Sequence, residues 1–318
     1  MAPLAHRLLL LYVPLLGWVL LGLALGHLLP QRWCNRLGQF LFWVGVPVSV
    51  MGFLRQADLS GAVWLAPAVA WVAILLGGAI AWIYIYQQTH TLAPPIDPPS
   101  KLHQTETQGS FLLAAMVGNT GYLGYPVTLA LVGAANFGWA LFYDMLGTTL
   151  GAYGLGVVLA SRFGRGTHRL HHPLMAFAIN PTLWSFGAGL ALRSQPLPWG
   201  VEVVLRQGAW GSVALSLVLI GMRLSQLRSW RNLKLASLTL SIKMVMIPLV
   251  LGLGLTALGL SGAPRLVLVL QMAMPPAFAT LVIGEAYRLD RDLTVTALAL
   301  GSAGLLLTLP LWLWLFPI

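Results

Sequence analysis

Two apolar runs of the chain contain residues that break a helix, and such a break leaves polar groups that can bind a ligand. The run over residues 110–132 contains the sequence GNTGYLGYP at 118–126, and the run over 266–286 contains MPPA at 274–277. Proline has no backbone N–H, so the carbonyl four residues before each proline loses its usual donor. In an apolar medium each unpaired backbone group is costly, so water, an ion or a substrate is expected to pair with it.

The two breaks are expected to form one binding site for a small organic anion. The N-terminus of each half-helix carries a partial positive charge, which stabilises an anion. A proline or glycine in one membrane helix commonly produces only a kink, but here both breaks fall near the middle of their runs. The expected substrate-binding residues are Asn119, Thr120, Gly121, Tyr122, Pro126, Met274, Pro275 and Pro276.

Two charged residues, Asp144 and Lys243, lie inside other apolar runs. Each is about eight residues from the end of its run, which corresponds to a depth of ~12 Å. A charge at the centre of a membrane helix costs ~2.5–3.5 kcal/mol, so both side chains should face protein or water. A mutual ion pair, a lysine that extends toward the membrane surface, and a role in ion or proton coupling all remain open. The similar depth predicts that the two side chains meet.

Other polar residues are weaker candidates. His168, His171 and His172 lie in a basic loop over 162–173, where solvated side chains are expected rather than a metal site. Glu285 lies near the end of its apolar run and is expected at the membrane interface. The single cysteine, Cys34, excludes an internal disulfide and a cysteine-built zinc site. Neither a metal nor a cofactor is expected.

The composition indicates what kind of elements carry these residues. Of the 318 residues, 58% are hydrophobic and 8% are charged, and the mean hydropathy is +0.81; soluble domains carry about 25% charged residues. The net charge of +10 does not indicate nucleic-acid binding, because the basic residues stand between apolar runs and form no polar face. The chain is expected to be an integral membrane protein whose surroundings are the lipid bilayer.

The expected fold is an all-α polytopic membrane protein with ten transmembrane helices. Spanning a bilayer takes about 20 mostly apolar residues. The ten runs that approach this length cover residues 8–29, 37–54, 63–86, 110–132, 137–161, 174–192, 207–222, 235–260, 266–286 and 293–316. The Pro-rich segment 87–109 is expected to be a flexible loop.

The chain is expected to consist of two inverted five-helix repeats. PLLGWVLLGLAL at 14–25 and PTLWSFGAGLAL at 181–192 both place proline eight residues before GLAL, and each marks the first of five runs. An odd number of spans reverses the second copy in the membrane. Residues 1–162 and 174–318 would then form an inverted pair, as in many secondary transporters, whose sites lie at broken helices near the midplane.

The orientation is predicted from the basic residues, which stay on the cytoplasmic side of membrane proteins. If the N-terminus is outside, the inner loops hold twelve Lys and Arg residues and the outer side holds five. The chain is therefore expected to cross the plasma or inner membrane with both termini outside.

The residues at the breaks resemble the auxin efflux carrier family, which includes plant auxin exporters and many bacterial permeases. The fourth helix of that family contains Asn-Thr-x-x-x-Gly-x-Pro, which residues 119–126 match. Pro275, Tyr287 and Asp292 match the spacing of its ninth and tenth helices, and the Asn180-Pro181 pair resembles the start of its sixth. Gly118, where the plant proteins have proline, and the short loop over 162–173 are departures, so auxin itself is not implied as the substrate.

The resemblance implies a scaffold of spans 1, 2, 6 and 7, and a transport domain of spans 3–5 and 8–10 in which broken helices 4 and 9 cross. It also implies a secondary active transporter, a permease or efflux carrier, that moves a small organic anion by alternating access, driven by protons or the membrane potential. Asp144 and Lys243 are the candidates for ion or proton coupling. A homodimer through the scaffold helices is an option that the sequence leaves open.

Three alternative functions differ in what they require. A sodium-coupled organic anion symporter of the bile-acid type needs several oxygen ligands near the break, where the run 266–286 offers mainly Gln271 and Thr280. An intramembrane enzyme is not expected, because the sequence has no His-Glu-x-x-His, no Gly-x-Ser-x-Gly and no histidine at mid-depth. A channel fits less well, because broken helices in both halves suit alternating access.

Overall fold

The computed structural model describes residues 4–90, 101–165, 181–225 and 232–318. Within these ranges every regular element is a helix, so the all-α prediction is confirmed. Five helical segments of the described residues are long and apolar enough to cross a membrane: Gln31–Leu54, Leu65–His90, Trp199–Ser225, Leu233–Ala257 and Arg291–Leu315. The ten membrane crossings and the inverted repeat stay predictions.

The helices of the first half follow the expected apolar runs. They are α1 (Leu4–Leu28), α2 (Gln31–Phe40), α3 (Val46–Leu54), α4 (Leu65–His90), α5 (Thr105–Met116), α6 (Tyr125–Val132), α7 (Phe137–Tyr143) and α8 (Val157–Phe163). A π-helical turn joins α2 to α3, and two more continue α7 into α8, so each of these pairs forms one rod. Among the described residues of the first half, the rod formed by α5 and α6 is the one with a non-helical break.

The helices of the second half include a second broken rod. They are α10 (Pro181–Ala191), α11 (Trp199–Ser225), α12 (Leu233–Leu240), α13 (Ile247–Ala257), α14 (Gly262–Met272), α15 (Phe278–Ala286) and α16 (Arg291–Leu315). A π-helical turn over Ser241–Met246 joins α12 to α13. The break lies between α14 and α15, at the expected MPPA sequence.

The prediction of a loop over 87–109 is wrong at both ends of that segment. Helix α4 continues to His90, where the Thr89 hydroxyl donates to the Ile85 carbonyl (2.9 Å) and the Tyr86 and His90 rings stack at 4.4 Å. Helix α5 already begins at Thr105, and the Thr107 hydroxyl donates to Asp290 (2.9 Å). These local and tertiary contacts stabilise helical turns that a polar composition does not indicate.

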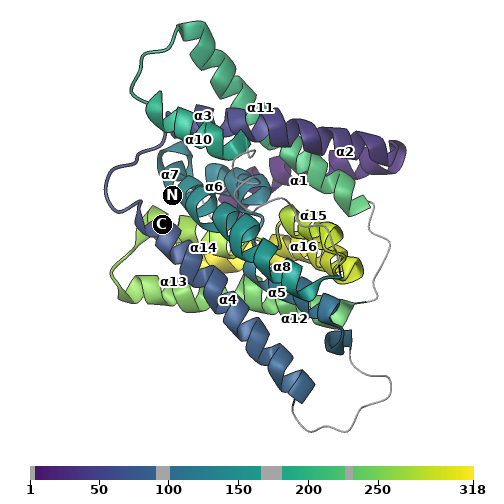
Figure 1. Ribbon diagram of the computed structural model, residues 1–318. Coiled ribbons are helices and arrows are strands. Elements are labelled where there is room, and N and C mark those ends of the chain that lie inside the picture. Colours follow the sequence, from purple (N-terminus) through teal and green to yellow (C-terminus); the bar gives the residue numbers. More distant parts are fainter. Residues whose placement is uncertain (1–3, 91–100, 166–180, 226–231) are drawn as a thin grey trace.

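Helices α1, α2, α3, α10 and α11 pack together on one side of the molecule, and α4, α5 and α12–α16 occupy the other (Figure 1). Helices α1 and α11 approach most closely at two glycines. A side chain at Gly22 would overlap the Val218 backbone, and one at Gly221 would overlap the Val19 carbonyl. Small residues at a crossing allow this close contact between helix backbones.

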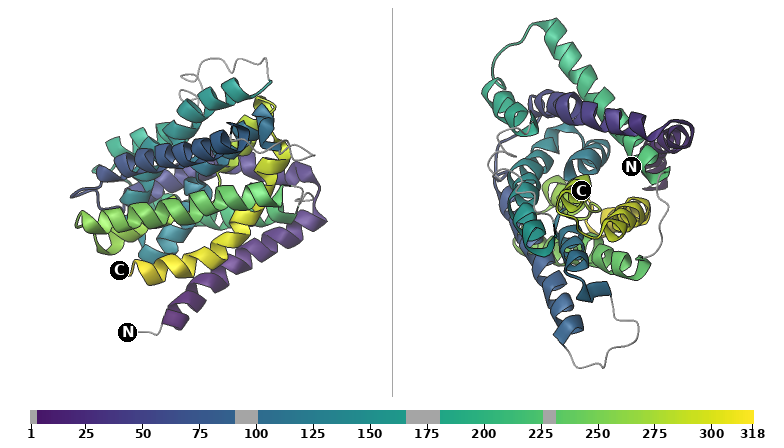
Figure 2. Two further views of the ribbon diagram at one scale, coloured as in Figure 1. Left: turned by 90° about the horizontal axis from the view of Figure 1, so that it is seen from below. Right: turned by 45° about the vertical axis from the view of Figure 1, so that its right-hand side comes forward.

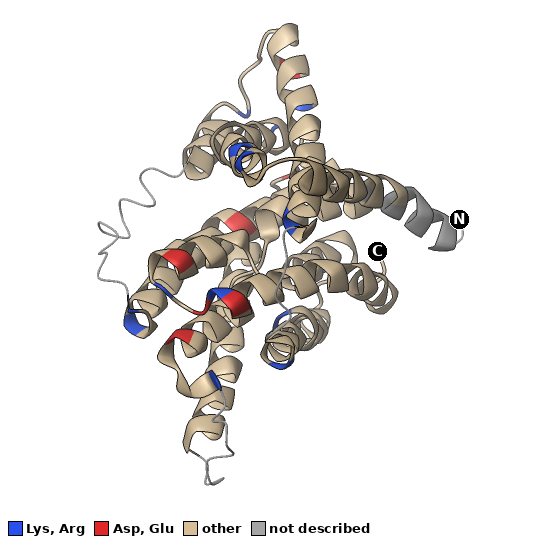
Figure 3. Cartoon of the chain, turned by 90° about the vertical axis from the view of Figure 1, so that its right-hand side faces the viewer, with Lys and Arg blue, Asp and Glu red and all other residues tan. Residues whose placement is uncertain are grey.

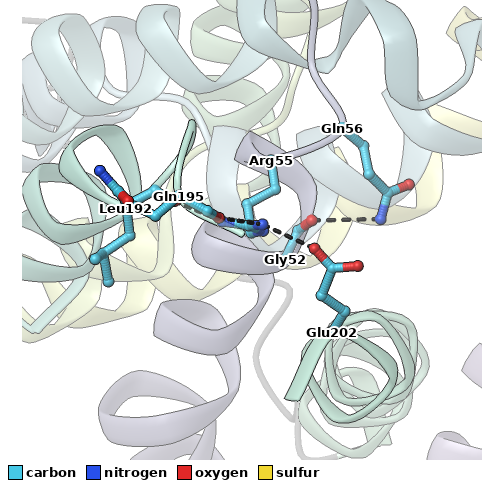
Figure 4. A network of polar contacts seen from close by, with 6 residues as sticks. All are labelled: Gly52, Arg55, Gln56, Leu192, Gln195 and Glu202. Carbon is cyan, nitrogen blue, oxygen red and sulfur yellow. Dashed lines mark hydrogen bonds and ion pairs between the residues drawn. The ribbon is translucent and has the colours of Figure 1, made fainter. Parts of the chain in front are cut away.

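The ends of the helices carry the polar groups that connect them. Figure 3 shows how few charged residues the helices have. The two ends of the described chain are close together: the start of α1 lies near the end of α16 in both views of Figure 2. At one end of α3, Arg55 donates to the carbonyls of Leu192 (2.5 Å) and Gln195 (3.0 Å) and pairs with Glu202 (2.8 Å) (Figure 4). This network attaches α3 to α11 and to the segment that precedes α11.

Candidate functional site

The two breaks cross and pair with each other through their backbones. After α5 the chain is extended at Val117, and before α15 it is extended at Ala277. The Asn119 N–H donates to the Pro275 carbonyl (2.7 Å), and the Ala277 N–H donates to the Val117 carbonyl (2.9 Å). Gly118 and Pro276 thereby form an antiparallel bridge. Part of the polar backbone that we expected water, an ion or a substrate to satisfy is satisfied by the other break.

The two carbonyls freed by the paired prolines also have protein partners. The Met272 carbonyl, opposite Pro276, accepts from the Lys243 ammonium at 3.0 Å. The Gln271 carbonyl, opposite Pro275, accepts from the Met274 N–H at 3.4 Å. Lys243 therefore places a positive charge at the C-terminus of α14, where the helix dipole stabilises a cation.

Asp144 lies at the end of a half-helix of the first break, as Lys243 does at the second break. Its carboxylate accepts from the Thr120 hydroxyl (2.5 Å) and from the Tyr125 hydroxyl (2.7 Å), and its side chain is buried. Thr120 begins the π-helical turn that leads into α6, so the negative charge lies near a helix N-terminus, where the dipole is favourable. A Cβ at Gly121 would lie 3.2 Å from Asp144 Oδ2, so glycine leaves room for this carboxylate.

The prediction that Asp144 and Lys243 meet is wrong. In the part of the chain that the structure describes, no ion pair joins them. Lys243 Nζ lies 3.1 Å from where a Cβ at Gly118 would be, whereas the Asp144 carboxylate lies beside Gly121. Two residues at a similar depth in the membrane can still point toward different parts of the crossing, and here Lys243 points toward Gly118 and Asp144 toward Gly121. Each charge is instead matched by a helix end and by its own hydrogen bonds.

We therefore expect the stability effects of Asp144→Asn and Lys243→Met to add. Each change removes a charge that satisfies buried polar groups, and losing such a partner costs about 1–3 kcal/mol. Sites without shared partners are additive to within about 0.3–0.5 kcal/mol. Thermal unfolding of the two single variants and the double variant in detergent measures this, with the exposed pair at Glu285 as control through Glu285→Gln. Recovery of stability in the double variant would mean that the two charges do interact.

A cavity of about 440 Å³ extends from the crossing to the ends of several helices. Its walls come from α2, α11, α15 and α16, and from the π-helical turn that follows Asn119. Asn119 and Tyr122 contribute at the crossing, and Gln31, Arg223, Glu285 and Arg291 contribute near the helix ends. Glu285 pairs with Arg291 at 2.8 Å, so the glutamate that we expected at the interface lines this cavity.

The expected site residues divide into three groups. Asn119 and Tyr122 line the large cavity, and Thr120 and Gly121 line a smaller one of about 100 Å³ together with Asp144. The prolines and the methionine of the breaks are buried in the crossing and line neither of these two cavities: Pro126, Met274, Pro275 and Pro276. His168, His171, His172 and Asn180 lie outside the described residues.

Arg223 is a site residue that is not among those predicted from the sequence. The orientation prediction includes it among the twelve basic residues of the inner loops, but it lies within α11 and lines the large cavity. Its guanidinium carbon lies 3.1 Å from the centre of the Phe278 ring, at the start of α15. The surrounding sequence, GMRLS, is an available signal, because an arginine directly after an apolar run can still lie in the helix.

Comparisons with known proteins identify similar transporters. Residues 174–313 match the model of a family described as membrane transport protein. An uncharacterized transporter of Methanothermobacter thermautotrophicus is 28% identical over 286 residues, which covers 89% of this chain and 88% of the relative. An uncharacterized transporter of Methanocaldococcus jannaschii is 27% identical over 200 residues, covering 61% and 63%. These matches confirm the family resemblance inferred from the breaks.

Proposed function

We propose that this chain, a permease of the auxin efflux carrier family of membrane transport proteins, is a secondary active transporter that moves a small organic anion by alternating access. The observation that carries the proposal is the large cavity, which leads from the helix ends to Asn119 at the crossing. A polar path that stops at two paired breaks suits a carrier with one central site better than a continuous pore.

The packing of the helices supports a division into a scaffold and a transport domain. The expected scaffold spans correspond to α1–α3, α10 and α11, which contact one another, while α4, α5, α12 and α16 contact one another on the other side. The large cavity has walls from both groups. Movement of the second group against the first would close this cavity and expose the crossing on the opposite face, as in carriers built from inverted repeats.

The crossing has the features that bind an anion. Helix α15 begins at Phe278, directly after the crossing, so its positive end lies close to Asn119, whereas the turn that begins at Thr120 already faces the Asp144 carboxylate. Phe278 and Asn119 line the same cavity. The partial charges and free N–H groups at such helix ends stabilise a negative group.

Coupling to protons through Asp144 is part of the proposal, and coupling to sodium is the second candidate. The small cavity beside the crossing is lined by Asp144, Thr120, Thr148 and Thr149, whose oxygens are of the type that hard cations prefer. The Gln271 side chain donates through Nε2 to Thr128 (3.1 Å), and the Thr280 hydroxyl donates to the Ala277 carbonyl (2.6 Å). Among the described residues Gln271 Oε1 is buried without a hydrogen-bond partner, so this amide oxygen supports the sodium-coupled candidate.

Uptake into proteoliposomes tests the proposal. We expect the purified protein to accumulate labelled monocarboxylates when a pH gradient or a potassium diffusion potential is imposed. Stimulation by a sodium gradient alone would select the sodium-coupled alternative. Protein-free liposomes are the control for passive entry of the protonated acid. If no carboxylate enters or exchanges faster than in those liposomes under any gradient, the chain is not an organic anion carrier.

A further inference from the structure

Arg223 is a cation in the large cavity that forms no ion pair with a carboxylate of the described residues. The ion pairs among the described residues are Arg55–Glu202, Arg165–Glu106 and Arg291–Glu285, and Arg223 is in none of them. Its Nε is buried and makes no hydrogen bond to any described residue. Burying part of a guanidinium without a matching anion is unfavourable, so a ligand that supplies one would be stabilised there.

The surroundings of Arg223 orient the guanidinium and leave it able to bind. One face lies over the Phe278 ring, and a Cβ at Gly38 would lie 2.9 Å from Nη2, so glycine provides the space that this group occupies. The Cys34 side chain interacts with it but carries no formal charge as a thiol. A guanidinium held against an aromatic ring keeps its N–H edge available for a planar carboxylate.

The charge balance of the cavity indicates how many negative charges the ligand carries. Glu285 and Arg291 neutralise each other, so Arg223 leaves the cavity with one uncompensated positive charge. One carboxylate balances it, whereas a second carboxylate would enter without a free cation. Charges taken out of water without a partner are costly, so a dicarboxylate is disfavoured.

The remaining walls determine the rest of the ligand. Six aliphatic side chains line the cavity: Leu219, Ile220, Leu224, Leu281, Val295 and Leu298. Polar side chains line it as well: Gln31, Asn35, Ser216 and Ser302. An apolar body would cover the aliphatic side chains, and burial of apolar surface is favourable. A volume of about 440 Å³ accommodates a small organic acid.

We infer that Arg223 binds the carboxylate of the transported substrate and that the substrate is a monocarboxylate with an apolar body. This inference rests on the proposed function and specifies its substrate class. Arg223 lies on α11, in the group proposed as the scaffold, and Phe278 lies on α15, in the proposed transport domain. The carboxylate would therefore be held where the two groups meet.

Three eight-carbon probes measure how much one carboxylate contributes to binding: octanoate, the dicarboxylate suberate and the neutral octanamide. Binding to the full chain in detergent is measured from the shift in thermal unfolding midpoint against probe concentration. We expect the wild type to bind octanoate at least about tenfold more tightly than either of the other probes, the discrimination that a charge-assisted bidentate contact gives. Equal binding of octanoate and octanamide, or no binding of octanoate, would overturn the inference.

Substitution of Arg223 identifies the residue responsible. Arg223→Gln should weaken octanoate binding about tenfold or more, and Arg223→Lys should retain part of it. Arg206→Gln is the matched control, because Arg206 is on the same helix but lines a different cavity. Unchanged octanoate binding in Arg223→Gln would contradict the assignment. If that variant does not fold, Arg223→Lys and the comparison of probes on the wild type still decide whether Arg223 binds the carboxylate.

The inference and the proposed function can fail separately. Gradient-driven uptake of carboxylates that is as fast in Arg223→Gln as in the wild type would keep the transporter and remove Arg223 from its site. Binding of octanoate that depends on Arg223, without uptake of any carboxylate, would keep the site and remove the transport function.

Discussion

Asn119→Ala is expected to lower transport by roughly tenfold or more while leaving the fold intact. The backbone N–H of Asn119 donates to the Pro275 carbonyl (2.7 Å), and alanine keeps that bond. The side-chain amide lines both cavities and makes no hydrogen bond to a residue that the structure describes, so it is available to a substrate. Loss of a hydrogen bond to a charged ligand costs about 1.5–3 kcal/mol, which lowers binding or rate by roughly tenfold or more.

Pro275→Ala should also impair transport, but less than Asn119→Ala. Alanine restores an N–H that can donate to the Gln271 carbonyl, whose bond from the Met274 N–H is long (3.4 Å). Helix α14 would then tend to extend and draw the Pro275 carbonyl away from Asn119. Pro276 still interrupts the helix one residue later, which limits the effect.

Exchange of labelled octanoate across proteoliposomes measures both variants, with thermal unfolding as the test of folding. Pro310→Ala is the matched control for proline removal, because Pro310 lies inside α16 and outside the crossing. If Asn119→Ala and Pro275→Ala both carry substrate at the wild-type rate, the crossing is structural and the substrate binds elsewhere.

The positions of the breaks could be predicted because proline and glycine act locally. The sequences at 118–126 and 274–277 concentrate glycine and proline, and the structure places both breaks where these residues stand, whereas the single Pro310 leaves α16 continuous. That the breaks bond to each other, through Asn119 and Pro275, could not be predicted from the sequence. It depends on how α5 and α14 cross, which no local preference determines.

The charges show the same limit more clearly. Depth along a helix predicted that Asp144 and Lys243 meet, but contact also requires the right direction around each helix axis, and Lys243 instead reaches the Met272 carbonyl. Arg223 was assigned to a loop because basic residues after apolar runs usually lie there. Arg223 faces a cavity because α11 packs against α2 and because the guanidinium lies over Phe278 of α15, which only the structure shows.

Gly221→Leu is expected to prevent correct folding, because it separates α11, which lines the large cavity, from α1. A Cβ at Gly221 would overlap the Val19 carbonyl and lie 2.7 Å from the Leu23 nitrogen, so backbone and not a flexible side chain blocks it. Overpacking a well-packed site typically costs 1–3 kcal/mol, occasionally more. Here α1 must move away from α11 along their shared contact, so we expect an effect above that range.

The matched control is Gly211→Leu, on the same helix. A Cβ at Gly211 would have nothing within 4 Å, so leucine there adds apolar surface without a clash. We expect Gly211→Leu to remain monodisperse in size-exclusion chromatography with an unfolding midpoint close to the wild type, and Gly221→Leu to aggregate or unfold at a much lower temperature. Gly221→Ala should fall between them, because its single methyl group needs a smaller displacement of α1.

The position of Gly221 also connects this contact to the site. Arg223 follows two residues later on α11, so a displacement of α11 from α1 would move the guanidinium relative to Phe278. Gly221→Ala, if it folds, should therefore bind octanoate more weakly than Gly211→Leu does, although neither residue lines the large cavity. Equal stability and equal octanoate affinity in the two variants would show that the close approach of α1 and α11 matters neither for the fold nor for the position of Arg223.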